Sequence, residues 1–144
     1  MTVPVRTDPA TEAWRLCMEI WFTERPLRLP AVAGQFDLSP MGVKMLHGLE
    51  PGAEVPMSGL AGQVGCDASN ITGIVDRMEA RGVIERRDDP SDRRVKLIAL
   101  TDEGAALRER VLERLHEPPA VIAALSLQDQ RTLRDVLRRA LEDR

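Results

Sequence analysis

Guanidinium and ammonium groups are dense in one short segment of the chain, and these are groups that bind phosphate. The segment holds Arg86, Arg87, Arg93, Arg94 and Lys96, with aspartates at positions 88, 89 and 92 between them. A charge run of this kind is often only a solvated loop. An arginine at the tip of a hairpin can instead enter the minor groove of DNA, where narrow A·T tracts concentrate negative potential. Arg93 and Arg94 are therefore candidate DNA contacts, with Asp92 well placed to hold Arg94.

A helix predicted over residues 67–81 is the second candidate for contact with DNA. Asp67 is a good N-cap, and Gly82 predicts a left-handed residue after the helix. One face is an apolar stripe made of Ile71, Ile74, Val75 and Met78. The opposite face is small and polar, as a helix in the major groove requires, although an ordinary surface helix also has a solvated face. The candidate contacts of this region are Ser58, Ala68, Ser69, Asn70, Thr72, Gly73 and Arg77.

The elements around these candidates predict a winged helix. A helix over residues 58–64 and a tight turn at Gly65-Cys66 precede the helix at 67–81, which is the outline of a helix-turn-helix. Residues 83–87 and 95–100 then read as two strands, because the second is rich in β-branched and apolar residues and a turn-forming hexamer at 88–93 separates them. This β-hairpin has a polar, basic tip.

Amphipathic helices are predicted on both sides of this unit. A helix over residues 12–23 is followed by Pro26 and Pro30, which predict a kink or an interruption before a second, bent piece over residues 27–36. Ser39-Pro40 begins the next helix and Pro51-Gly52 ends it. After the hairpin, Thr101 begins a long helix that Pro118-Pro119 stops, and Ser126 with Asp129 begins the last one. The fold class expected is mainly α with a small β-hairpin.

Composition limits the classes of protein that fit. The 144 residues carry a net charge of −3, which by itself argues against nucleic-acid binding unless positive charge gathers on one face. The N-terminus has no signal-peptide pattern and no segment is long and apolar enough to span a membrane, so we expect a cytoplasmic protein without a membrane partner. Cys17 and Cys66 form no CxxC motif and are expected to be reduced.

The segment from Met57 to Gly104 closely resembles the MarR (multiple antibiotic resistance regulator) family. The most specific motifs are Asp89-Pro90-Ser91-Asp92-Arg93-Arg94 and Leu100-Thr101-Asp102-Glu103-Gly104. The resemblance implies a single MarR-type domain over residues 1–144, with a winged helix-turn-helix at 38–101 and dimerisation helices at 10–37 and 102–144. It also implies a homodimeric, ligand-responsive repressor of transcription on a palindromic operator in double-stranded DNA. The helix at residues 67–81 would then lie in the major groove and a wing arginine in the minor groove.

The resemblance further implies a small-molecule effector between the dimerisation helices and the winged helix. The side chains expected at this pocket are Met18, Trp21, Phe22, Met45 and His47. They favour an aromatic or other lipophilic effector.

Four other functions are considered. A redox sensor would use Cys17, as the peroxide-sensing branch of the family does, but the chain has no tyrosine to activate it, and a cysteine between Trp14 and Trp21 is expected to be a buried, inert thiol. A metal sensor lacks ligand spacing, so we expect no metal and no cofactor. No nucleophile elbow, phosphate loop or HExxH motif points to an enzyme. A protein-interaction module without DNA binding fits the acidic charge and predicts replaceable wing arginines.

Overall fold

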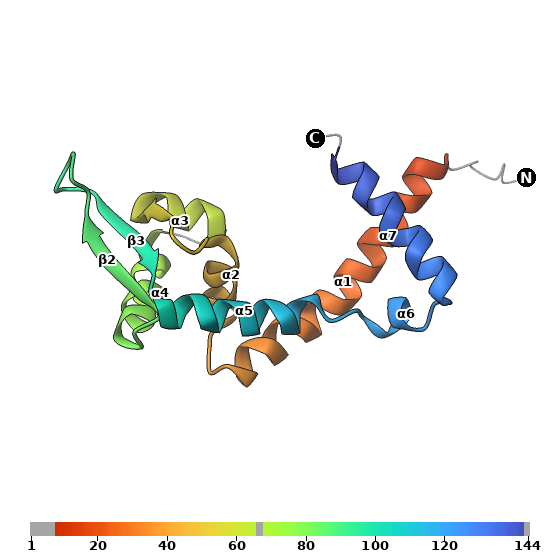
Figure 1. Cartoon of the computed structure of the whole chain (residues 1–144), viewed down its shortest axis with the longest axis horizontal. Helices are drawn as coiled ribbons and strands as arrows, with labels where there is room; N and C mark the ends of the chain where they lie inside the picture. Colours follow the sequence, from red (N-terminus) through yellow and green to blue (C-terminus); the bar gives the residue numbers. More distant parts are fainter. Residues whose placement is uncertain (1–7, 66–67, 143–144) are drawn as a thin grey trace, which may run out of the picture.

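The computed structural model describes residues 8–65 and 68–142, with the backbone alone for 68 and 69. No helix in these ranges is long and apolar enough to cross a bilayer. Figure 1 shows an elongated chain, with the hairpin at one end and both termini at the other. The elements are α1 (Pro9–Gln35), α2 (Pro40–Gly48), β1 (Glu54–Pro56), α3 (Met57–Val64), α4 (Ala68–Ala80), β2 (Ile84–Asp88), β3 (Lys96–Leu100), α5 (Asp102–His116), α6 (Ala120–Ala123) and α7 (Leu127–Glu142).

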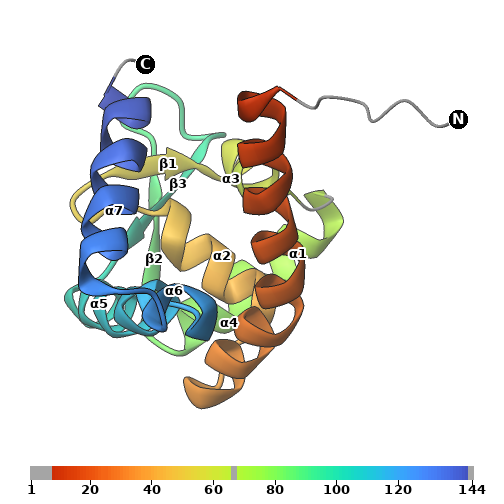
Figure 2. The same cartoon turned by 90° about the vertical axis from the view of Figure 1, so that its right-hand side faces the viewer.

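The first helix runs without a break through Pro26 and Pro30, so of the predicted kink or interruption only the interruption is wrong. Asp8 begins α1, because its carboxylate accepts hydrogen bonds from the amides of Ala10 and Thr11. The two prolines are four residues apart and therefore lie on one face of the helix. Their missing N–H groups are lost on the same side, which a bent helix accommodates more readily than losses on opposite sides. Figure 2 shows α1 changing direction along its length.

The helix-turn-helix is formed by α3 and α4. Local signals set the ends of these helices and of α2, which precedes them. Ser39 caps α2 as predicted, since its hydroxyl accepts from the amide of Gly42 at 3.0 Å. Gly65 ends α3 in the left-handed conformation, with φ of +70°. The predicted N-cap Asp67 and the turn residue Cys66 lie outside the described residues.

The predicted hairpin is present, and it belongs to a three-stranded antiparallel sheet. Strands β2 and β3 pair from Ile84–Leu100 to Asp88–Lys96. The third strand, β1, pairs with the other edge of β3, so the strand order is β1-β3-β2. The sequence does not predict β1, because three residues that end in proline show neither alternation nor a turn signal.

The start of α5 is fixed to the base of the hairpin. The Thr101 hydroxyl accepts from the amide of Gly104 and donates to the carbonyl of Gly82 at 2.6 Å. A Cβ at Gly104 would lie 1.8 Å from the carbonyl oxygen of Val83, so only glycine permits this approach. The first turn of α5 is therefore in direct contact with Val83, the residue that precedes β2.

The hydrophobic core lies under the helix-turn-helix and the sheet. It contains side chains from α2, α3, α4, the strands and α5, among them Leu46, Leu60, Val75, Ile98 and Val111. From α1 only Val32 and Ala33 are buried, and α6 and α7 bury no residue at all. Figure 2 shows α1 and α7 standing on opposite sides of the view, apart from each other.

Candidate nucleic-acid interface

The outward face of α4 is polar, as the sequence predicts. Its inward residues are at most 5% exposed, and they are Ile71, Ile74, Val75 and Met78. The side chains of Asn70, Thr72 and Arg77 are exposed on the other side. Because the apolar stripe fixes the rotation of the helix about its axis, these polar side chains face away from the core.

Gly73 lies on this outward side and is half-buried. A Cβ at this position would approach the Arg77 guanidinium to 3.9 Å, so the arginine side chain extends along the helix towards Gly73. This is an ordinary van der Waals distance, so the Arg77 side chain lies over the helix surface close to Gly73.

The tip of the wing is an ordered turn that presents two arginines. Asp89 accepts hydrogen bonds from the amide and the hydroxyl of Ser91, at 2.8 and 2.6 Å, and the hydroxyl contributes most to lowering the pKa of this carboxyl group. Asp92 accepts from the backbone amide and the Nε of Arg94, as the sequence analysis expected. The Arg94 side chain is nevertheless 92% exposed. Arg93 is also exposed and makes no ion pair with any described residue.

The base of the wing differs from its tip, because its cations are paired within the chain. Arg87 forms an ion pair with Glu54 of β1 at 2.8 Å and a second one with Glu85. Lys96 pairs with Asp88 across the hairpin. Arg86 pairs with two carboxylates of α4. Arg94 at the tip is 92% exposed, whereas the paired side chains of Arg87 and Lys96 at the base are only about half exposed.

The remaining predicted DNA contacts are placed only in part. Ser58 is exposed in the first turn of α3. Ala68 and Ser69 begin α4, but their side chains lie outside the described residues. Figure 1 shows α4 next to the hairpin at one end of the molecule, so the helix and the wing tip belong to the same end.

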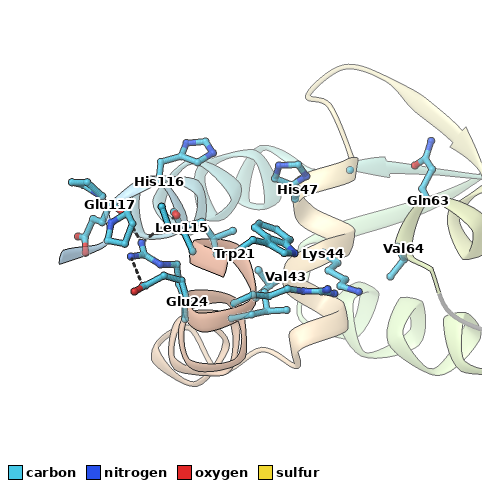
Figure 3. A pocket seen from close by; sticks show the side chains of 17 residues that line it. Trp21, Glu24, Val43, Lys44, His47, Gln63, Val64, Leu115, His116 and Glu117 are labelled. Atoms are coloured by element: carbon cyan, nitrogen blue, oxygen red, sulfur yellow. Dashed lines mark hydrogen bonds and ion pairs between the residues drawn. The ribbon is translucent and has the colours of Figure 1, made fainter. Parts of the chain in front are cut away.

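A cavity of about 600 Å³ opens where α1, α2 and the end of α5 meet. Figure 3 shows its lining, with Trp21 from α1, His47 from α2 and Leu115 from α5. Its cationic side chains are Arg25, Arg28 and Lys44. Arg28 is engaged within the chain, because it pairs with Glu24 at 3.6 Å and donates to the carbonyls of Leu115 and Glu117. Arg25 lies over the ring of Trp21, 5.5 Å from its centre.

The five side chains expected at an effector pocket do not all reach this cavity. Trp21 and His47 line it. Met45 is fully buried in the core instead, Phe22 is 62% exposed, and Met18 is half-buried without lining the cavity. Helical periodicity placed these residues on the correct helices, but the side of each helix that faces the cavity depends on tertiary packing.

Cys17 is exposed, so the expectation of a buried thiol is wrong. The helix buries only Val32 and Ala33, near its C-terminal end, and Cys17 lies far from them along α1. Within the described residues no three metal-ligating side chains come together.

Comparison with known proteins agrees with this architecture. A model of the MarR family matches residues 44–96, from α2 to the start of β3. The helix-turn-helix-type transcriptional regulator YdgJ of Bacillus subtilis is 31% identical over 71% of this chain, but this chain covers only 63% of its length. MarR from Escherichia coli has the same fold, with a TM-score of 0.74, 22% identity and coverage of 98% of each chain.

A probable transcriptional regulator from Pseudomonas aeruginosa is 30% identical, with a TM-score of 0.56 and coverage of 85% of this chain and 96% of that chain. The family model includes the helix-turn-helix, β2 and the motif Asp89–Arg94, and it ends before the motif at residues 100–104. The structural matches also extend over the terminal helices. The chain belongs to the MarR family of transcriptional regulators.

Proposed function

We propose that this protein is a transcriptional regulator, most simply a repressor, that binds a palindromic operator in double-stranded DNA as a homodimer. In this proposal α4 reads the major groove through Asn70, Thr72 and Arg77, joined by Ser58, Ala68, Ser69 and Gly73. Arg93 and Arg94 of the wing reach the minor groove. The observation that carries the proposal is that exposed polar side chains of α4 and two exposed arginines of the wing tip lie at one end of the molecule.

An acidic protein can bind DNA if positive charge is presented where the protein meets the phosphates. The net charge of −3 would repel a phosphate backbone if it were spread evenly. The wing tip presents two arginines whose nearest acid, Asp92, orients Arg94 without covering it. An orienting carboxylate of this kind favours a fixed direction for the guanidinium, which suits insertion into a narrow groove.

A homodimer is supported by the terminal helices. Their large apolar side chains are exposed in the single chain, and the most exposed are Trp14, Phe22, Leu27, Leu127 and Leu141. Apolar faces of this extent, on helix segments that bury no residue within their own chain, are typical of an interface between subunits. A two-fold axis through such an interface would present two α4 helices to half-sites about one helical turn apart.

The test is fluorescence anisotropy with the DNA upstream of the gene and with a scrambled duplex, over a range of salt concentrations. The variant is Arg94→Ala. The matched control is Arg110→Ala, which removes an exposed arginine in the middle of α5. We expect wild type and Arg110→Ala to bind the upstream duplex at about 10 nM or below and to weaken steeply with salt. We expect Arg94→Ala to lose about tenfold or more in affinity.

Weak binding that is equal for both duplexes would contradict the proposal. A loss that is the same for Arg94→Ala and Arg110→Ala would remove the wing from the interface, because the effect would then be one of net charge alone. In the first case the protein-interaction reading would take the place of DNA binding.

The cavity beside Trp21 and His47 is the proposed site of a small aromatic effector. Its position supports this, because α1 and the end of α5 form its walls and also lead to the terminal helices. A ligand there would change the spacing of the two α4 helices in the dimer, and the protein would then release the DNA.

The effector proposal can be tested with salicylate and its neutral analogue salicylamide. The chain has two tryptophans, of which Trp21 lines the cavity and Trp14 does not. We expect a probe to quench the fluorescence of Trp14→Phe, which retains Trp21, and to leave that of Trp21→Phe unchanged. Quenching of Trp14 alone, or no effect of either probe on fluorescence and on DNA binding, would contradict the proposal.

A further inference from the structure

Helix α4 and the wing are connected covalently at one point only. The helix ends in a turn in which Gly82 donates to the carbonyl of Glu79 at 2.9 Å and Val83 donates to that of Met78 at 3.0 Å. Gly82 adopts φ of +76°, the left-handed conformation of a helix C-cap. From this turn β2 runs directly to the tip of the hairpin. One turn places the two elements next to each other, but their mutual angle also depends on contacts beyond it.

Arg86 supplies such a contact. It lies on β2, four residues after Gly82, and its side chain is 25% exposed. One end of the guanidinium binds Asp76 and the other binds Glu79, so a single planar group joins two carboxylates of α4. Among the described residues this is the only hydrogen-bonded side-chain link between α4 and the two strands of the wing. Helix, turn and strand therefore form a closed triangle.

The chemistry of the link favours arginine at this position. The hydrogen bond to Asp76 and the charges of both carboxylates raise the pKa of Arg86, so it stays charged at every physiological pH. A guanidinium presents a rigid fork of donors that can hold two acceptors at once, whereas a lysine ammonium acts as a point charge. The neighbouring Arg87 has similar chemistry but faces Glu54 and Glu85, away from α4.

We infer that Arg86 is a positioning residue, which fixes the angle between α4 and the wing so that both reach DNA in one register. The inference rests on the proposed function for its consequence in DNA binding. Asp76 is 57% exposed on α4, so Arg86 also reduces the negative charge that this helix would bring towards phosphate. Its role in geometry and its role in charge can be separated by experiment.

The test compares Arg86→Lys with Arg87→Lys as the matched control, since both keep the charge of the wing and each loses a forked arginine. Anisotropy is measured on the upstream duplex and on the scrambled duplex. For Arg86→Lys we expect the affinity for the upstream duplex to fall about tenfold. This is roughly the loss that one mismatched base pair in the operator would cause. Affinity for the scrambled duplex and the salt dependence should not change, because they follow charge. For Arg87→Lys the ratio of the two affinities should equal that of wild type.

A third variant separates charge from geometry. Arg86→Gln combined with Asp76→Asn and Glu79→Gln removes the positive charge together with both negative charges. Recovery of the full ratio in this variant would overturn the inference, since neutralisation alone would then explain the effect. An Arg86→Lys protein with the same ratio as Arg87→Lys would overturn it too.

The angle itself can be measured without DNA. Spin labels at Thr72→Cys and Ser91→Cys, in a background with Cys17→Ser and Cys66→Ser, report the distance from α4 to the wing tip when labelled chains are diluted with unlabelled ones. We expect one narrow distance distribution with Arg86 and a broader or displaced one with Arg86→Lys. An unchanged distribution would overturn the inference whatever the DNA results, whereas absence of specific binding by wild type would overturn the proposed function.

Discussion

The middle of the chain buries its large apolar side chains, whereas the two ends of the chain leave theirs exposed. We call residues 32–111 the winged-helix body and residues 9–31 and 120–142 the terminal arms. Within the described residues, every buried apolar side chain lies in the body, from Val32 to Val111. Every large apolar side chain that is exposed lies in the arms, from Trp14 to Leu27 and from Val121 to Leu141.

The difference separates two sources of stability. The body closes its own core, so its free energy of unfolding comes from contacts within one chain. The arms have helix caps and an amphipathic pattern but no core to cover, so we expect their stability to come from a second chain. Variants that act on one region and not on the other therefore test this division.

The largest contrast is expected between equal truncations in the two regions. Leu46→Ala removes a fully buried side chain of the body and is expected to lower the free energy of unfolding by about 2–5 kcal/mol. Leu137→Ala removes a side chain of α7 that is 46% exposed in the single chain. Its effect should depend on protein concentration, because it weakens association. Thermal melts at a series of protein concentrations measure both, and a concentration-independent loss in Leu137→Ala would contradict the division.

The next largest effect is expected from Gly104→Ala, in the first turn of α5 and inside the body. The added Cβ would collide with the backbone of Val83, which cannot move without displacing β2. We expect a loss of about 3 kcal/mol, at the upper end of the usual cost of overpacking. Gly62→Ala in α3 is the control, because nothing lies within 4 Å of its Cβ. Urea unfolding measures both, and equal midpoints would show that the contact with Val83 is not a constraint.

A smaller effect is expected from hydroxyl groups. Thr101→Ala removes the cap of α5 and the bond to Gly82, which should cost about 1 kcal/mol. Thr132→Ala in the arm removes a hydroxyl that only donates to the carbonyl of Gln128 in its own helix. We expect this variant to change stability by less than about 0.5 kcal/mol. Melting temperatures of the two variants are compared in one buffer. A larger loss of stability in Thr132→Ala than in Thr101→Ala would contradict this prediction.

The smallest effect on stability is expected at the wing tip. Arg94→Ala removes a side chain that is 92% exposed and should alter the free energy of unfolding by less than about 0.5 kcal/mol. Its affinity for DNA should nevertheless fall, as described above. A clear loss of stability would mean that the arginine serves the fold and not the interface.

The sequence predicts those elements whose ends carry their own signals. Ser39, Thr101 and Ser126 begin helices, and Gly82 ends one, as expected from side-chain chemistry within a few residues. The inward stripe of α4 is also confirmed. Four apolar residues at helical spacing determine which face of the helix packs on the core. These signals are local, so they do not depend on the rest of the fold.

Other features depend on contacts between segments that are far apart in the sequence. Strand β1 exists because its three residues meet the free edge of β3. In the sequence, Arg86 is one of several basic residues in a charge cluster. In the structure, the turn at Gly82 places it next to Asp76. The lining of the cavity follows from how α1, α2 and α5 pack, which is why Met45 lies in the core while His47 lies at the cavity. Single-helix periodicity contains none of this information.

The division between body and arms is tested most directly by the mass of the protein in solution. Size-exclusion chromatography with light scattering should give wild type twice the 16.0 kDa of one chain. Leu137→Glu, which places a charge on the apolar face of α7, should give the mass of one chain while circular dichroism shows that the body is still folded. A wild type that stays monomeric at micromolar concentration, or a Leu137→Glu variant that stays dimeric, would contradict the account.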